Sequence, residues 1–310
     1  MKGLELSEKF FNEYGLPAFR EAVPEMMDHL TFGLVGQGSE CFGFDDEISR
    51  DHDWGPGFCV WVPSERFQEW APKLTKIYAS LPKNYEGFAV KGVASCNGDQ
   101  RVGVLDGDMF LYQFIGLKGV AGNNMGWFRA KDEAYAVVSN GKLFTPNKTK
   151  FSLDYADLKA GYPDDVRIKK IAARAVKMAQ SGQYNYVRSM KRGNKVAAFQ
   201  SLNEFVKETC GMIHLLNHTY CPFYKWMWRS LEEQPVLGAA VKDGLEQLVM
   251  DPYSENNKDA IEDICLLVKK ELQAESLTDS EDDFLEPHGV SIMSRIRDPQ
   301  LRMLPVSWDC

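Results

Sequence analysis

The fold can be worked out from the stretch Leu30-Thr-Phe-Gly-Leu-Val-Gly-Gln-Gly-Ser39, an apolar run that ends in glycines and a serine. The run from Leu30 to Val35 predicts a buried strand, and Gly36 predicts the turn that ends it. A strand that leads into a glycine turn exposes backbone N–H groups and a hydroxyl, which are the donors that bind phosphate. Gly38 and Ser39 are therefore the first candidate binding residues.

Two carboxylates follow in the segment Asp51-His52-Asp53. Side chains at positions i and i+2 of an extended segment point to the same side, where one hard cation can bridge them. His52 faces the opposite way and is predicted to be structural. The apolar run 58–62 comes next and predicts a second buried strand, at whose start unpaired carboxylates are costly. A Mg²⁺ ion between Asp51 and Asp53 removes that cost, and a metal beside a triphosphate is what nucleotidyl transfer needs.

The periodicity of the chain changes part-way along. Apolar runs and helical spacing alternate up to about residue 145, Ser139-Asn-Gly-Lys142 predicts a hairpin turn, and nearly everything after residue 164 predicts helix. We therefore expect an α+β protein, with an N-terminal mixed sheet flanked by helices at 1–150 and an all-helical domain at 151–310. The acidic stretch 271–286 predicts a solvated loop. The expected elements of the first part are strands 30–35, 58–62 and 101–105 and helices 4–30, 64–81 and 108–116.

Composition narrows the class of protein. The chain has 310 residues, of which 44% are hydrophobic, so it can bury a full core. Lys and Arg number 36 against 44 Asp and Glu, and the net charge of −8 argues against bulk nucleic-acid binding. Seven scattered cysteines without a C-x-x-C pair or a signal peptide indicate a reducing, cytoplasmic setting. No apolar run is long enough to span a membrane.

These motifs resemble those of a known superfamily and, more narrowly, those of one bacterial family. The order strand, Gly-Ser, Asp-x-Asp, strand resembles the nucleotidyltransferase superfamily, which has the DNA polymerase beta-like fold. Longer pieces resemble a bacterial family named domain of unknown function 4037, over most of the chain from about Leu30 to Leu231. The pieces are Gly36-Gln-Gly-Ser-Glu40, Ser49-Arg-Asp-His-Asp-Trp54, Tyr162-Pro-Asp-Asp-Val166, Gly182-Gln-Tyr-Asn-Tyr186 with Arg188, Arg192-Gly193, and Leu215 to Trp226.

The superfamily resemblance implies a role for each matching residue. Gly38 and Ser39 would hold the β- and γ-phosphates of a nucleoside triphosphate, with ATP as the default. Asp51 and Asp53 would be the catalytic carboxylates and would hold Mg²⁺, or Mn²⁺ as the alternative metal. A hydroxyl acceptor, on a small molecule or a polymer end, would attack the α-phosphorus in line. The acceptor itself is unknown, and tRNA remains open.

One departure from the superfamily pattern concerns a third carboxylate on a later strand. The matching strand, Arg101-Val-Gly-Val-Leu105, carries Gly103 at that position. Asp106 and Asp108 stand close by, and either could be the third metal ligand or a residue that caps the following helix. A catalytically weak or inactive nucleotide-binding or sensor protein of the same fold is therefore the alternative function.

A second group of candidates lies in the helical half, at Tyr184, Asn185, Arg188, Arg192 and Lys225. Arginine offers a planar fork for phosphate, and tyrosine can stack on a base. The competing interpretation is that the aromatic rings pack between helices and the cations are exposed. The apolar neighbours of Arg188 and Lys225 in the sequence favour an anionic partner, either a triphosphate or the acidic pair at 164–165.

Overall fold

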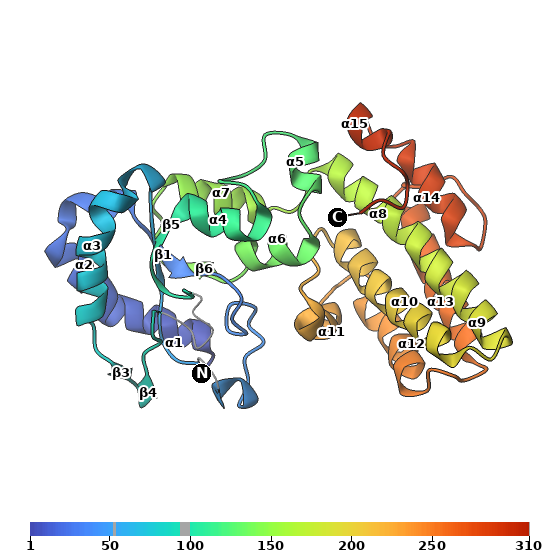
Figure 1. Cartoon of the computed structure of the whole chain (residues 1–310), viewed down its shortest axis with the longest axis horizontal. Helices are drawn as coiled ribbons and strands as arrows, with labels where there is room; N and C mark the ends of the chain where they lie inside the picture. Colours follow the sequence, from blue (N-terminus) through green and yellow to red (C-terminus); the bar gives the residue numbers. More distant parts are fainter. Residues whose placement is uncertain (52–53, 94–99, 310) are drawn as a thin grey trace. The chain divides into compact units, whose positions relative to one another are not determined.

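The computed structural model describes residues 1–51, 54–93 and 100–309, without the side chain of Asp51. The chain divides into two compact units, each with its own internal contacts. Unit 1 comprises residues 1–120 and 134–160, and unit 2 comprises residues 121–133 and 161–310 (Figure 1). The boundary at residue 160 groups the helix at 150–159 with the sheet of unit 1, whereas the sequence suggested a division after residue 150.

Unit 1 is built on a four-stranded mixed sheet. Its order is β5-β2-β1-β6, with β1 antiparallel to both β2 and β6, and β2 parallel to β5. A separate two-stranded ribbon pairs β3 with β4. The predicted strands at 30–35, 58–62 and 101–105 are confirmed. The strands are β1 (Thr31–Leu34), β2 (Cys59–Val62), β3 (Asn84–Tyr85), β4 (Phe88–Ala89), β5 (Gly103–Asp106) and β6 (Lys142–Leu143).

Helices line the sheet because its strands carry large apolar side chains. An aromatic core that includes Phe10, Phe19, Phe32 and Phe58, none of them exposed, joins the N-terminal helices to β1 and β2. The predicted helices at 64–81 and 108–116 are confirmed as α3 and α4. The helical segments of unit 1 are α1 (Gly3–Phe10), the π-helix Phe11–Gly15, α2 (Leu16–Ala22), the 3-10 turns Pro24–His29 and Ile48–Asp51, α3 (Ser64–Ser80), α4 (Gly107–Ile115) and α7 (Lys150–Lys159).

The predicted hairpin turn at residues 139–142 is wrong. Helix α6 (Asp132–Ser139) ends there, and Gly141 then leads the chain into β6, which pairs with β1. Gly141 has φ +63°, and a Cβ atom on it would lie 2.0 Å from the carbonyl oxygen of Leu34. An Asn-Gly pair supplies a left-handed residue, which a helix end uses as readily as a hairpin does.

Unit 2 is helical in its described part, as the sequence predicts, and the α+β class is confirmed. The expected acidic loop is shorter than predicted, because α13 continues to Ala274, and Leu277 and Thr278 within it are buried. The helices are α5 (Asn124–Phe128), α8 (Asp164–Met178), the π-helix Ala179–Tyr186, α9 (Val187–Lys191), α10 (Lys195–Leu216), α11 (Tyr224–Glu232), α12 (Gly238–Met250), α13 (Asn257–Ala274), α14 (Leu285–Met293) and α15 (Pro299–Arg302).

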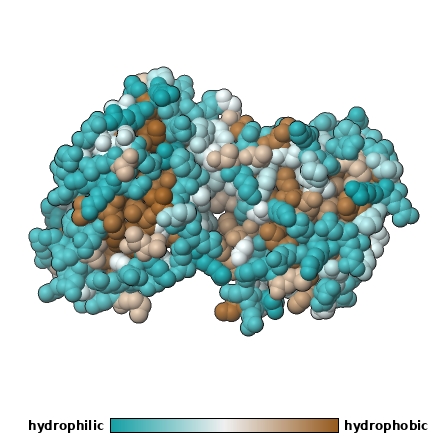
Figure 2. Space-filling view, turned by 180° about the vertical axis from the view of Figure 1, so that it is seen from behind, coloured by the Kyte–Doolittle hydropathy of each residue, from teal (hydrophilic) through white to brown (hydrophobic). Residues whose placement is uncertain are grey.

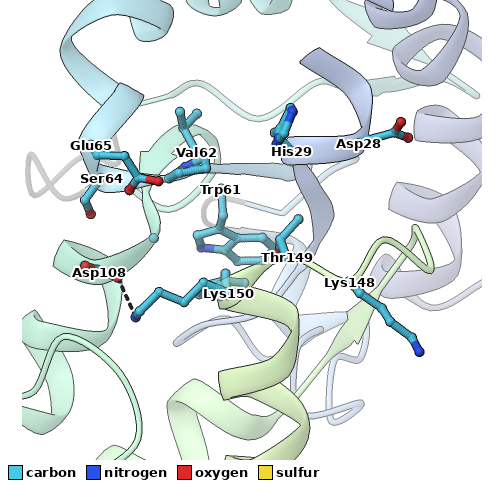
Figure 3. A pocket seen from close by; sticks show the side chains of 13 residues that line it. Asp28, His29, Trp61, Val62, Ser64, Glu65, Asp108, Lys148, Thr149 and Lys150 are labelled. Carbon is cyan, nitrogen blue, oxygen red and sulfur yellow. Dashed lines mark hydrogen bonds and ion pairs between the residues drawn. The ribbon is translucent and has the colours of Figure 1, made fainter. Parts of the chain in front are cut away.

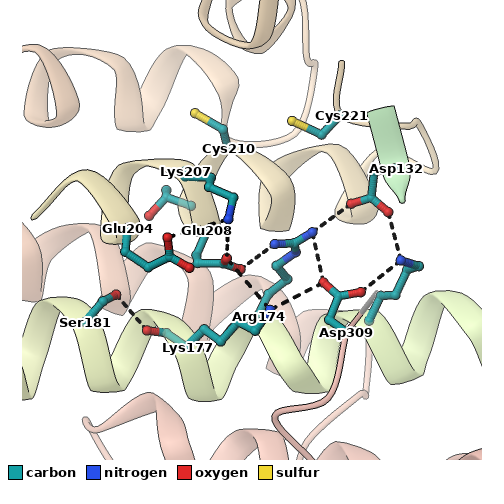
Figure 4. A network of polar contacts seen from close by, with 12 residues as sticks. Asp132, Arg174, Lys177, Ser181, Glu204, Lys207, Glu208, Cys210, Cys221 and Asp309 are labelled. Atoms are coloured by element: carbon teal, nitrogen blue, oxygen red, sulfur yellow. Dashed lines mark hydrogen bonds and ion pairs between the residues drawn. The ribbon is translucent and has the colours of Figure 1, made fainter. Parts of the chain in front are cut away.

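A buried ionic network ties four segments of unit 2 together (Figure 4). Arg174 on α8 contacts three carboxylates, those of Asp132 at 2.8 Å, Asp309 at 2.9 Å and Glu208. Lys170, one turn earlier, contacts Asp132 at 3.0 Å and Asp309 at 2.9 Å. Burial raises the pKa of Asp132, but the positive charges of Lys170 and Arg174 outweigh it and hold that pKa well below its usual range. Buried charges need such pairing because an isolated one is costly.

The surface and the cysteines complete the description. On the face shown in Figure 2 most of the surface is hydrophilic, with apolar residues gathered in patches. No helix in the described part of the chain has the length and apolar character needed to cross a membrane. The described cysteines are free and buried, at positions 41, 59, 210, 221 and 265.

Candidate functional site

The strand register of unit 1 brings the predicted phosphate turn to one end of the sheet. Gly33 of β1 pairs with Cys59 of β2, and Cys59 pairs in turn with Gly103 of β5. Because β1 runs antiparallel to the other two strands, its carboxyl end meets their amino ends. The turn that follows β1 therefore lies at the same end of the sheet as the residues that lead into β5.

A cavity of about 640 Å³ opens beside this turn. Its lining comes from the turn after β1, from β5 and the residues before it, and from α3 and α4; it includes Gly36, Gly38, Glu40, Arg101 and Asp106. The volume falls in the range of small-molecule sites, which is about 300–1,000 Å³. Gly38 and Asp106, both predicted site residues, thus border one space.

The turn itself is held by Asn140, whose role the sequence analysis missed. The Asn140 side chain accepts the Gly36 N–H at 3.0 Å and donates to the Gly36 carbonyl at 2.7 Å. Gly36 has φ +147°, which favours glycine. The Gly38 carbonyl accepts the Cys41 N–H at 3.0 Å. Within the described residues no partner is found for the N–H groups of Gly38 and Ser39 or for the Ser39 hydroxyl, so the turn presents uncommitted donors.

Glu40 brings a negative charge to the cavity wall, but that charge is already paired. Its carboxylate contacts the ammonium group of Lys91, and the two side chains are only 6% and 7% exposed. The thiol of Cys59 lies in the same buried region, and burial raises its pKa to about 12. Cys59 is therefore a neutral packing group at physiological pH, and Glu40 is held by an ion pair.

The two candidates for a third carboxylate lie in different places. Asp106 is the N-cap of α4, as one of the two sequence interpretations expected, and accepts the Met109 N–H at 3.1 Å and the Ser64 hydroxyl. Asp108 pairs with Lys150 at 2.8 Å and lines another cavity. Asp106 is thus the candidate that shares a cavity with Gly38, although its carboxylate already caps a helix.

Gly103, the position where the superfamily pattern leads us to expect a carboxylate, has a backbone conformation suited to glycine. Its φ is +96°, and a Cβ atom on it would lie 3.3 Å from both methyl groups of Val93. A side chain there is strained by the backbone and crowded by its neighbour. The strand therefore has no acidic group at this position, and the positive φ explains why a glycine is found there.

The two predicted metal ligands cannot be placed by the described structure. Asp53 lies outside the described residues, as does the side chain of Asp51; the backbone of Asp51 ends the 3-10 turn that begins at Ile48. Among the described residues no group of three or more His, Cys, Asp or Glu side chains could hold a metal ion. Glu40 and Asp106, the described carboxylates that line this cavity, are both already engaged.

The candidates in unit 2 are on the surface. Tyr184, Asn185, Arg188 and Arg192 are exposed, and Arg188 donates to the Tyr184 hydroxyl at 2.8 Å while lying 4.7 Å from the ring centroid. Lys225 is also exposed, with its ammonium 4.9 Å from the ring centroid of Trp226. The interpretation that apolar surroundings force Arg188 and Lys225 to find an anionic partner is wrong, because water reaches both. Their role in nucleotide binding stays a prediction.

Helix α10 separates these surface candidates from one another. Residues 184–192 precede its first residue, and Lys225 follows its last. Its 22 residues span about 33 Å at the rise of an α-helix. Figure 1 accordingly places α9 and α11 at opposite ends of unit 2. Arg188 and Lys225 therefore do not converge on one phosphate group.

Comparison with known proteins gives a family for the central part of the chain. Residues 127–227 match the model of a family described as Domain of unknown function (DUF4037). This confirms the predicted resemblance to DUF4037 over residues 127–227, which is less than the predicted extent from about Leu30 to Leu231. The matched residues include Asp132, Lys170, Arg174 and Glu208 of the buried network. The family description names no reaction, so the function has to be argued from the site.

A solved structure is also similar to this chain. It is the crystal structure of a nucleotidyltransferase-like protein from Exiguobacterium sibiricum 255-15, with 14% sequence identity and a TM-score of 0.39. The similarity covers 94% of this chain and 79% of that chain. No curated protein matches the sequence.

Proposed function

We propose that the chain is a nucleotidyltransferase, which moves a nucleoside monophosphate from a nucleoside triphosphate to a hydroxyl acceptor. The acceptor hydroxyl gives up its proton to solvent, its oxygen forms a bond to the α-phosphorus, the bond from that phosphorus to the bridging oxygen breaks, and pyrophosphate leaves. The observation that carries the proposal is the cavity at the Gly36–Gly38 turn, where uncommitted backbone N–H groups border a space of about 640 Å³. Backbone donors of this kind bind phosphate oxygens without a clash from side chains.

Each candidate residue of unit 1 then has a proposed task, although of these only Gly38 is in the described lining of the cavity. Gly38 and Ser39 bind the β- and γ-phosphates through N–H groups and the hydroxyl, and Asn140 keeps the turn in the shape that presents them. Asp51 and Asp53 would hold Mg²⁺, with Mn²⁺ as the alternative. When bound, the metal would supply positive charge to the triphosphate and the departing pyrophosphate. ATP is the proposed nucleotide, and a cytoplasmic location remains a prediction from the sequence.

One observation favours the alternative of a nucleotide-binding protein that turns over slowly or not at all. Gly103 occupies the strand position of the expected third carboxylate, and its φ of +96° disfavours any side chain there. Asp106, which shares the cavity, already caps α4. An acceptor hydroxyl near β5 would then lack a base, whereas the phosphate-binding turn would be unaffected.

Calorimetry with ATP and Mg²⁺, combined with an assay for pyrophosphate release, separates the two functions. The matched variants are Asp51→Asn and Asp53→Asn, with Glu47→Gln as the control. Glu47 is an exposed acid in the same polar loop, so its replacement removes one charge without touching the proposed site. We expect both aspartate variants to lose Mg²⁺-dependent binding and the Glu47 variant to behave as wild type.

The acceptor assay uses a panel of hydroxyl compounds that includes tRNA. Pyrophosphate release that needs one of these acceptors supports the transferase. Tight ATP binding with no pyrophosphate release in the presence of any of these acceptors favours the sensor. If wild-type protein binds no nucleotide, or if Asp51→Asn and Asp53→Asn bind ATP and Mg²⁺ normally, the assignment of this cavity is wrong.

A further inference from the structure

A second cavity, of about 240 Å³, lies at the other end of the sheet of unit 1 (Figure 3). Its walls include Trp61 and Val62 at the carboxyl end of β2, and the first residues of three helices, α3, α4 and α7. The lining of this cavity shares no residue with that of the cavity at the Gly36–Gly38 turn. The two cavities are therefore separate.

The N-termini of α3, α4 and α7 all border this cavity. These helices have 17, 9 and 10 residues, and they begin at Ser64, Gly107 and Lys150, all of which line the cavity. The first N–H groups of a helix have no acceptor within the helix, and the helix dipole makes this end positive. Within the described residues no acceptor is found for the N–H groups of Ser64, Lys150 and Phe151. The starts of α3 and α7 therefore supply uncommitted donors.

Trp61 gives independent evidence that the cavity takes a ligand. The side chain is 1% exposed, its ring stacks on Phe151 at 4.3 Å between centroids, and Phe110 packs against it edge-on at 5.5 Å. Within the described residues its Nε1–H has no hydrogen-bond acceptor. An indole is a donor only, and leaving a buried donor unpaired costs about 1–3 kcal/mol. In Figure 3 the nitrogen edge of the ring faces the side of the cavity where Asp108 and Lys150 lie.

The charges around the cavity limit the kind of ligand. The Lys150 ammonium lies 2.8 Å from Asp108 and 2.9 Å from Asp154. Burial lowers the pKa of Lys150, but its hydrogen bonds to these two carboxylates raise it, and the net shift is upward, so this side chain stays cationic. The side chains of Asp28 and Lys148 extend away from Trp61 in Figure 3. The donors are thus mainly neutral N–H groups, and a polyphosphate would meet too many carboxylates.

We propose that this cavity binds a small oxyanion, with the oxygens of a phosphate or carboxylate group accepting from Trp61 Nε1–H and from the first N–H groups of α3 and α7. Such an ion satisfies the orphaned indole and complements three helix dipoles at once. The site goes beyond the proposed transfer reaction and involves none of its residues. It would serve as a separate place to bind a small acidic metabolite or inorganic phosphate.

The test uses the full chain with ¹⁵N-labelled tryptophan, and it follows the indole N–H signal of Trp61 by NMR. The signal is assigned from its loss in Trp61→Phe, a change that keeps the ring and removes the donor. Inorganic phosphate and, separately, acetate are titrated at constant ionic strength against sodium chloride. We expect the Trp61 signal to shift downfield and to saturate with one of the two ions, which also tells phosphate from carboxylate.

Two charge variants make the test specific. Lys150→Gln should weaken binding about two- to fivefold, because it removes a charge from the first turn of α7. Lys76→Gln, an exposed position further along α3, removes the same charge elsewhere and should bind as wild type. No shift with either ion, a shift that sodium chloride reproduces, or equal affinity in Lys150→Gln would overturn the proposal. Asp51→Asn should leave this titration unchanged, so its outcome is independent of the transfer reaction.

Discussion

Replacing Asp132 by asparagine tests whether the buried ionic network stabilises unit 2. The substitution keeps the volume of the side chain and the acceptor for the Tyr162 hydroxyl, which lies 2.7 Å away. It removes the negative charge that faces Lys170 at 3.0 Å and Arg174 at 2.8 Å. Removing one partner of a buried pair costs about 3–5 kcal/mol. Asp309 still contacts both cations, so we expect the lower end, about 3 kcal/mol.

Urea denaturation followed by far-UV circular dichroism measures this loss, because the helices of unit 2 contribute strongly to that signal. With a slope of about 1.5–3 kcal/mol per molar, the midpoint should fall by roughly 1–2 M. The matched control is Glu204→Gln on α10, which breaks a 3.5 Å contact with Lys207 between side chains that are 44% and 54% exposed. A surface pair of this kind contributes about 1 kcal/mol or less.

The pH dependence gives a second check on the same reasoning. Burial raises the pKa of Asp132, but Lys170 and Arg174 outweigh it and hold the folded-state pKa well below the unfolded value of about 3.9. A depressed carboxyl pKa stabilises the fold above the unfolded value, and this contribution is lost as the pH falls toward the folded value. The difference between wild type and Asp132→Asn should therefore be full at neutral pH and shrink below about pH 4. A variant no less stable than Glu204→Gln, or a pH-independent difference, would refute the argument.

Three further predictions concern unit 1. Gly141→Ala should lower the melting temperature much more than Gly43→Ala. A Cβ atom at position 141 would lie 2.0 Å from the Leu34 carbonyl oxygen. Gly43, at φ +75°, has open space around it, so its replacement should lower the free energy of unfolding by only about 1–2 kcal/mol. The Cys59 thiol, whose pKa burial raises to about 12, should resist iodoacetamide at pH 8 in native protein and react once urea unfolds it, as peptide mass spectrometry will show. Asp106→Ala should cost about 0.5–2 kcal/mol in urea denaturation through the lost cap of α4, and Asp106→Asn should restore most of it.

The strands and helices were predictable because their signals are local. The apolar run before Gly36 and the one before Pro63 each predicted a strand, and both strands are present as β1 and β2. The Asn-Gly pair at 140–141 predicted a hairpin turn, whereas the structure has a left-handed glycine between helix α6 and strand β6. What the pair could not tell was whether a helix or a strand precedes it, because both can end on a left-handed glycine.

The buried network lay beyond sequence reasoning because its members are far apart in the chain. Asp132 and Asp309 reach Lys170 and Arg174 only after the helices have packed. One signal was available: Lys170 and Arg174 are four residues apart in a helix, next to the apolar residues Ile171, Ala173 and Ala175. In the folded protein α8 is buried on nearly all sides. Two cations inside such a helix require buried anions.

The spacing of Asp106 and Asp108 along the chain does not tell whether the two carboxylates share a site. They lie two residues apart in the sequence, yet Asp106 borders the cavity of the Gly36–Gly38 turn and Asp108 borders the cavity of Trp61. The pairing of Cys59 with Gly103 and of Val62 with Asp106 puts about 10 Å of strand between the two ends of the sheet. The two cavities share no lining residue, so a ligand in one leaves the donors at the other free. For this reason the loss of nucleotide binding in Asp53→Asn and the loss of oxyanion binding in Lys150→Gln should occur independently of each other.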